Sequence, residues 1–382
     1  MENLAHSLVG ASFAELALPA GASTAHRRIF FTAGVIAANL PDADLLYTRI
    51  MAPPLGYSLH HRGHTHTLVG LVVQWMLVAL VCSLPAIRTA IAPVRARFWT
   101  LVAASLLSHI VLDSWNSYGV HPFYPFDNRW FYGDAVSVVE PWLWVLLGVA
   151  VAVNTKNRYG RLVVAGLIVG LPFVFVRVGF VSIGSLIAPV VIGAALALFA
   201  VRVSPRARTI TALASTALFV ISLFGLKQVA RARVLARASA DTGGEIVDMI
   251  MSPKEANPLC WTTIVVAKNE SLGTFSLRRG VVAVARGWGG ARCDEWNNAD
   301  VQSLTRLRDL ARDDCWVRAW LEFGRAPYIE GDEIADYRFG NRRGNFSGMT
   351  IVRGRGCPAY VPGWGRPRRD LLRSTATEGP ST

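Results

Sequence analysis

The 24-residue stretch Val178–Val201, VGFVSIGSLIAPVVIGAALALFAV, carries no charged side chain and decides the fold class. A helix rises 1.5 Å per residue, so about 20 apolar residues cross the roughly 30 Å hydrocarbon core of a bilayer. Uncharged or apolar runs recur through the first part of the chain. They predict about eight membrane-spanning helices, the others lying near Leu4–Ala20, Ile29–Leu46, Thr67–Pro85, Phe98–Ser108, Pro141–Val153, Leu162–Val176 and Thr209–Leu226.

The composition changes near residue 227. Residues 1–226 hold all 8 histidines but only 15 of the 39 Lys and Arg residues and 8 of the 26 acidic ones. The chain of 382 residues is 52% hydrophobic and 17% charged, where soluble domains average about 25% charged. This excludes a disordered chain and an ordinary soluble enzyme. We predict an all-α polytopic membrane bundle at 1–226, a small extramembrane α+β domain at 227–361 and a flexible basic tail at 362–382.

In the more polar part after residue 227, the sequence pattern predicts several strands and one long helix. Strands are expected at 246–251, 261–267, 274–277, 281–285 and 346–352, and a helix at 301–323. The net charge of +13 is spread over membrane loops and this domain, so no specific nucleic-acid binding is expected. Four of the five cysteines lie in this part, where they could form two disulfides or remain buried thiols: Cys260, Cys293, Cys315 and Cys357.

The loop charges predict an orientation in the membrane. One set of short loops carries 11 positive charges and the opposite set only 4, and the richer set should face the cytoplasm. The N-terminus, the loops near 47–66 and 114–140, and the C-terminal part are then extracytoplasmic. Lys227 and Arg231, just after the last span, argue the other way.

Acidic and histidine side chains gather on that extracytoplasmic face. Ionisable groups near a membrane are costly and usually mark function. Imidazole and carboxylate are the usual ligands of zinc, and carboxylates also suit manganese and magnesium. The pattern therefore predicts a divalent-metal site. Six of the 8 acids and 7 of the 8 histidines map there: Asp42, Asp44, Asp113, Asp127, Asp134, Glu140, His6, His60, His61, His64, His66, His109 and His121.

Three short motifs carry this pattern. His109 and Asp113 are four residues apart at the end of an apolar run and would share one helix face. The stretch 60–66, HHRGHTH, packs four imidazoles before the next span, and the stretch 41–44, PDAD, ends the second apolar segment. Each alone has another reading: a hydrogen-bonded pair, a pH sensor or a helix cap.

At these residues the sequence resembles the YdjM-type inner-membrane proteins, described as LexA-regulated, membrane-bound, metal-dependent hydrolases. The resemblance covers about residues 1–226 and implies a metal-dependent hydrolase. It also extends to 252–261 and 336–340 in the polar domain. It rests on His6, the stretches 39–44 (NLPDAD), 60–66 and 108–113, and Gly133-Asp134 ahead of Glu140.

The order of these residues is also similar, more distantly, to zinc-dependent phospholipases C and single-strand nucleases. That similarity implies two or three zinc ions, with manganese or magnesium as alternatives, and a metal-activated water that cleaves a phosphoester of a lipid or lipid-linked substrate. The later His and Glu spacing differs from that of those soluble enzymes. The implied metal ligands are His6, Asp42, His66, His109, Asp113, His121 and Glu140. Asp44, His60 and His64 are candidates for a general base or for residues that orient the metal ligands.

Arg62 is the one cation within the histidine stretch. It could hold a substrate phosphate with both guanidinium nitrogens, or pair with a nearby aspartate. Two other functions would use the same cluster: a divalent-metal transporter and a non-catalytic scaffold that binds metal for stability. A transporter should carry polar residues deep in several helices, but the spans after residue 155 carry almost none apart from Arg177.

Overall fold

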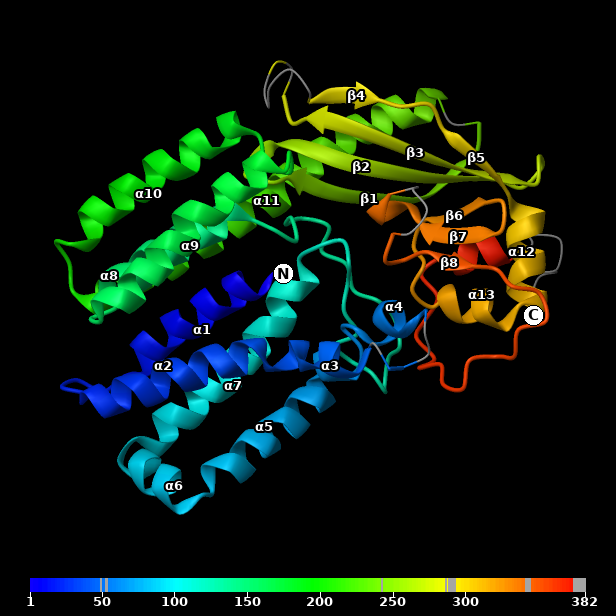
Figure 1. Ribbon diagram of the computed structural model, residues 1–382. Helices are drawn as coiled ribbons and strands as arrows, with labels where there is room; N and C mark the ends of the chain where they lie inside the picture. Colours follow the sequence, from blue (N-terminus) through cyan, green and yellow to red (C-terminus); the bar gives the residue numbers. More distant parts are fainter. Residues whose placement is uncertain are drawn as a thin grey trace, which may run out of the picture.

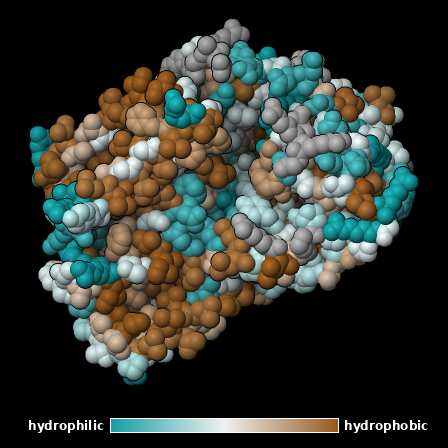
Figure 2. All heavy atoms as spheres, viewed as in Figure 1, coloured by the Kyte–Doolittle hydropathy of each residue, from teal (hydrophilic) through white to brown (hydrophobic). Residues whose placement is uncertain are grey.

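A computed structural model describes the chain except residues 49, 52–53, 242, 286, 288–292, 341–344 and 374–382. It has a helical N-terminal part and a sheet-containing C-terminal part, which lie side by side in Figure 1. In Figure 2, hydrophobic side chains cover much of the helical part, whereas hydrophilic ones are frequent over the sheet-containing part. This difference matches a bundle that faces lipid and a domain that faces water.

The helical part packs around α1 (Asn3–Ala17), which contacts α2 (Thr24–Asn39), α7 (Arg95–Ser114), α8 (Pro141–Asn154) and α11 (Pro205–Asp241). Gly10 and Gly34 let α1 and α2 touch through their backbones, since a Cβ on Gly10 would lie 2.3 Å from the Gly34 carbonyl oxygen. The other elements are η1 (Leu40–Asp44), α3 (Leu45–Thr48), α4 (Gly56–His60), η2 (His64–His66), α5 (Leu68–Cys82), α6 (Pro85–Ile91), η3 (Ala92–Val94), α9 (Arg158–Arg177), η4 (Ile183–Leu186) and α10 (Ile187–Ala200).

Within the described residues, five helices are long and apolar enough to cross a membrane. A sixth candidate is the pair Gly56–His66 and Leu68–Cys82, which is bent by 70° at its break. The helix at Pro141–Asn154 is apolar but shorter, so the predicted number of eight spans is not confirmed. The five are Thr24–Thr48, Pro85–Ser114, Arg158–Arg177, Ile183–Ala200 and Pro205–Ala240.

The larger sheet of the C-terminal part is antiparallel, in the order β1 (Glu245–Lys254), β2 (Asn257–Asn269), β3 (Thr274–Ala283) and β4 (Asp294–Trp296), and β5 (Asp300–Ser303) also pairs with β3. Successive side chains point to opposite faces. On one face, Trp261 and Val265 belong to the same hydrophobic core as Val234 of α11. On the opposite face, Ile264 and Val266 belong to a second hydrophobic core. The long helix α11 thus runs past residue 227 and joins the bundle to the sheet.

The second core lies between this sheet and the helices α12 (Leu304–Asp313) and α13 (Cys315–Trp320). A smaller sheet of β6 (Pro327–Glu330), β7 (Glu333–Asp336) and β8 (Met349–Thr350), then η5 (Tyr337–Phe339) and α14 (Arg369–Leu372), complete the described elements. The predicted helix 301–323 is broken because Asp314 caps α13, accepting hydrogen bonds from the Trp316 and Val317 amides. Disulfides join Cys260 to Cys293 and Cys315 to Cys357.

The side chain of Arg325 binds carboxylates from both parts of the structure. Its guanidinium donates to both carboxylate oxygens of Asp134, in the loop before α8, at 2.8 Å, and to Asp248 in β1 at 2.8 and 3.2 Å. It also lies 4.0 Å from the ring centre of Tyr132. Arg325 and Asp134 are both buried, so removing either partner would leave an uncompensated buried charge.

Part of the predicted tail is packed rather than free. Trp364 is buried, and its indole N–H donates to the Leu59 carbonyl oxygen at 2.7 Å. A carboxylate oxygen of Glu322 accepts the backbone N–H groups of Gly363 and Trp364 at 2.9 Å. The expectation of a flexible tail from residue 362 is therefore corrected for 362–373, because a large aromatic ring there fills a site on the helical part. Residues 374–382 lie outside the described residues.

Candidate metal centre

Four predicted ligands from three segments converge at one end of the bundle. Asp42 comes from η1, His66 from η2, and His109 and Asp113 from the last turns of α7. One ligand atom of each lies within 4.8 Å of the corresponding atom of every other. The His66 and His109 Nε2 atoms are 3.0 Å apart, and each is 3.3–3.5 Å from an Asp42 and an Asp113 oxygen. His66, His109 and Asp113 are buried.

Hydrogen bonds at the far side of each ring fix which nitrogen faces the cluster. His109 Nδ1 lies 2.7 Å from the Ala38 carbonyl oxygen, which only accepts, so Nδ1 carries the proton. His66 Nδ1 lies 3.4 Å from an Asp44 oxygen and 3.0 Å from the Thr65 hydroxyl. In the neutral rings, both Nε2 atoms then present lone pairs to each other and to two carboxylates. Four electron-rich groups at this spacing fit a cation between them.

Asp44 holds the loop behind His66. Its oxygens accept hydrogen bonds at 3.0 Å from the His61 ring, the Arg62 backbone N–H and the Thr65 hydroxyl. Asp42 and Asp44 therefore bracket His66, one at each ring nitrogen. Asp42, Asp44 and His61 form a second, adjoining group whose ligand atoms also lie within 4.8 Å of one another. His61 received no predicted role; its position next to His60 was the only signal in the sequence.

Asp113 is the most crowded carboxylate of the centre. His6 Nε2 lies 3.4 Å from Asp113 Oδ1, and the His6 ring stacks on His109 with ring centres 3.8 Å apart. The amine of Met1 also contacts Asp113. Within the described part of the chain, both buried nitrogens of His6 and Oδ2 of Asp113 lack a hydrogen-bond partner. Such unsatisfied buried atoms are costly, and a divalent ion held by the four-residue group would satisfy Asp113 Oδ2. The predicted ligand His6 belongs to neither ligand group.

Arg62 forms an ion pair with Asp113 of the metal centre. Its Nη2 lies 3.0 Å from Asp113 Oδ1, its Nη1 donates to the Asn116 side chain at 3.0 Å, and the guanidinium sits over the Tyr118 ring. Arg62 has a φ of 59°, an unusual value for a residue with a side chain. Of the two predicted roles, the observed geometry is that of a partner for an aspartate, because both terminal nitrogens are engaged.

His60 and His64 lie beside the centre and face the C-terminal part. The His60 ring stacks on Tyr360, with ring centres 5.6 Å apart, and its Nε2 is buried without a partner among the described residues. His64 is half-buried and lies 5.1 Å from the Trp364 ring. His60 is buried, and His64 Nε2 lies 3.5 Å from the Tyr360 hydroxyl. Neither histidine belongs to the two ligand groups.

The structure does not bring His121 and Glu140 into either ligand group. The ring centre of His121 lies 3.8 Å from that of Trp130 and 4.1 Å from that of Trp364, and burial lowers the pKa of His121 to about 3. Glu140 caps α8 by accepting the Trp142 amide, and burial raises its pKa to about 8. Neighbouring aromatic and capping contacts hold both side chains outside the two ligand groups.

The sequence was compared with known proteins and structures. The profile of the YdjM inner membrane proteins matches residues 1–183. The chain is 36% identical over 129 residues to the inner membrane protein YbcI of Escherichia coli (strain K12), covering 33% of this chain and 70% of that protein. The chain belongs to the YdjM inner membrane protein family. The match spans the segments that supply His6, Asp42, His66, His109 and Asp113. No solved structure matches the chain.

Proposed function

We propose that this YdjM family member is a metal-dependent hydrolase embedded in the inner membrane, and that it cleaves a phosphoester of a lipid or lipid-linked substrate. The observation that carries the proposal is the group of Asp42, His66, His109 and Asp113, with both Nε2 lone pairs directed inward. This donor set suits zinc, and its two carboxylates also suit manganese.

The bound ion would supply Lewis acidity toward water and phosphoryl oxygens. The protein residues then divide the remaining work. Asp44 orients His66 and fixes the loop through the Arg62 amide, while Arg62 balances the charge of Asp113. His64 and His60 are candidates to move the proton, because they lie beside the ligands without belonging to them. The adjoining Asp42–Asp44–His61 group is where a second ion would bind.

We further propose that the centre and the C-terminal part are extracytoplasmic and that eight helices, including the short α1 and α8, form the bundle. We also propose a domain division of 1–226 and 227–361, with residues 362–373 packed against the described structure rather than free. Two disulfides in the C-terminal part support this side, since disulfides persist in oxidising compartments. The proposed ligands lie at the starts or ends of apolar helices. If these helices cross the membrane as proposed, the ligands lie at the depth of the lipid headgroups.

The test is hydrolysis of a phosphodiester, bis-p-nitrophenyl phosphate, and of phospholipids by the detergent-purified full chain loaded with zinc or manganese. We expect His109→Ala to lose metal and activity together, and His64→Gln to keep metal but lose activity. His26→Gln is the matched control, because the His26 ring hydrogen-bonds with Ser23 and Ala90, away from the ligand groups. Bound metal without hydrolysis of any phosphoester would favour the scaffold or transporter alternatives.

A further inference from the structure

A pocket of about 320 Å³ lies between α1, α2 and the loop after α8. It is at the opposite end of the bundle from the metal centre. Glu15 lines the pocket and His6 joins the centre, nine residues apart on α1, which is about 14 Å along a helix. On α2, Arg28 lines the pocket, while Asp42 follows the far end of the helix. The pocket is therefore a separate feature.

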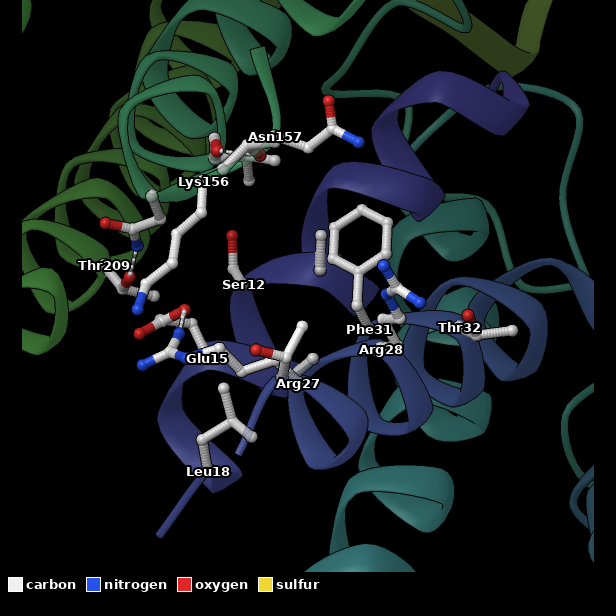
Figure 3. Close-up of a pocket in the computed structure, with 16 residues that line it drawn as sticks. Ser12, Glu15, Leu18, Arg27, Arg28, Phe31, Thr32, Lys156, Asn157 and Thr209 are labelled. Atoms are coloured by element: carbon white, nitrogen blue, oxygen red, sulfur yellow. Dashed lines mark hydrogen bonds and ion pairs between the residues drawn. The ribbon is translucent and has the colours of Figure 1, made fainter. Parts of the chain in front are cut away.

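Three cations and one carboxylate line this pocket: Arg27, Arg28, Lys156 and Glu15. The Arg27 guanidinium pairs with Glu15 at 3.3 Å, which leaves an excess of two positive charges. Within the described part of the chain, Arg28 and Lys156 form no hydrogen bond or ion pair, and the buried Nε of Arg27 has no partner. In Figure 3, Ser12 points into the space between Lys156 on one side and Phe31 on the other.

The rest of the lining is apolar. Ala11, Ala14, Leu18 and Val151 contribute to the walls, and Phe31 lies at the outer face of α2 with 43% of its surface exposed. A free anion would need only the cations, whereas a molecule with an anionic head and a hydrocarbon tail would use both surfaces. In a protein of the inner membrane, that chemistry belongs to the surrounding anionic phospholipid.

We propose that this pocket binds an anionic phospholipid, with the headgroup phosphate between Arg28 and Lys156 and the first acyl carbons against Phe31 and Leu18. Basic pockets between membrane helices bind such headgroups. A zwitterionic lipid carries its own cation, so the excess positive charge discriminates against it. The proposal rests on the membrane location and does not depend on hydrolysis at the metal centre.

The test titrates the detergent-purified full chain with phosphatidylglycerol, phosphatidylcholine or inorganic phosphate and follows thermal melting. Of these three additions, we expect only phosphatidylglycerol to raise the melting temperature of the protein. Each cation near a lipid headgroup is worth about 1 kcal/mol, so Arg28→Gln with Lys156→Gln should weaken phosphatidylglycerol binding roughly 30-fold. Both residues are exposed, so this variant should melt like wild type before lipid is added.

The matched control is Arg88→Gln with Arg95→Gln, which removes two exposed cations, on α6 and at the start of α7, that do not line the pocket. This variant should bind phosphatidylglycerol like wild type. Equal stabilisation by phosphatidylcholine, or equal losses in the pocket and control variants, would overturn the proposal. Stabilisation by inorganic phosphate alone would overturn the assignment to a lipid and leave a simple anion site.

Discussion

Replacing Asp44 tests whether the centre depends on how its histidines are held. Asp44→Ala removes the carboxylate that lies 3.4 Å from His66 Nδ1 and accepts three hydrogen bonds at 3.0 Å. Partners that orient a ligating histidine are worth about 10–100-fold in metal affinity, or about 1.4–2.7 kcal/mol. The variant also leaves the Arg62 amide unpaired, which costs about 1–3 kcal/mol of stability.

The assay is zinc competition against a chromophoric chelator, with melting of the metal-free protein measured in parallel. Asp44→Asn separates the two effects, because the amide oxygen still accepts the Arg62 N–H while the charge beside His66 is lost. We expect its zinc affinity to fall about 10-fold with little change in melting. Asp127→Asn is the control, since the Asp127 carboxylate pairs with the exposed Arg129 and belongs to neither ligand group. Wild-type zinc affinity in Asp44→Ala would refute the orienting role.

Two further predictions concern the contact between the two parts, and a third concerns the disulfides of the C-terminal part. Arg325→Ala should destabilise the protein by about 3–5 kcal/mol, because it leaves Asp134 and Asp248 without their shared cation. The exposed-site control Arg312→Ala should change stability by less than about 1 kcal/mol. Similar melting temperatures of the two variants would contradict this prediction. Burial raises the pKa of Asp248, but the guanidinium groups of Arg325 and Arg368 and the Met249 backbone N–H together lower it below its usual value. The stabilisation that Asp248 contributes is therefore present above about pH 4 and lost as the pH falls further. The melting temperature of wild type should fall more steeply there than that of Asp248→Asn, and parallel curves would be the opposing result. Reducing the two disulfides should cost about 2–5 kcal/mol each, seen as a lower melting temperature of the sheet-containing part; unchanged melting after confirmed reduction would count against them.

Local spacing predicted the parts of the centre that lie on regular helix. His109 and Asp113 share a face of α7 as the four-residue spacing requires. The stretch holding Asp42 and Asp44 is a 3-10 helix, and the two carboxylates reach opposite nitrogens of His66. That arrangement depends on tertiary packing, which spacing does not encode.

The membrane character and the sheet-containing part also followed from the sequence, because long uncharged runs and β-branched strands are local signals. The exact strand count did not. Residues 274–277 and 281–285 were predicted as separate strands, but β3 runs unbroken from Thr274 to Ala283 because β2 pairs along its whole length. The packing of Trp364 onto Leu59 was likewise missed, since nothing local links residues 305 positions apart.

The most direct test of the central claim is the metal content of the detergent-purified full chain, measured by mass spectrometry beside His109→Ala and Asp113→Ala. The account predicts at least one tightly held equivalent of zinc or manganese in wild type and its loss in both variants. No bound metal in wild type, together with no rise in melting temperature on adding zinc, manganese or magnesium, would contradict it.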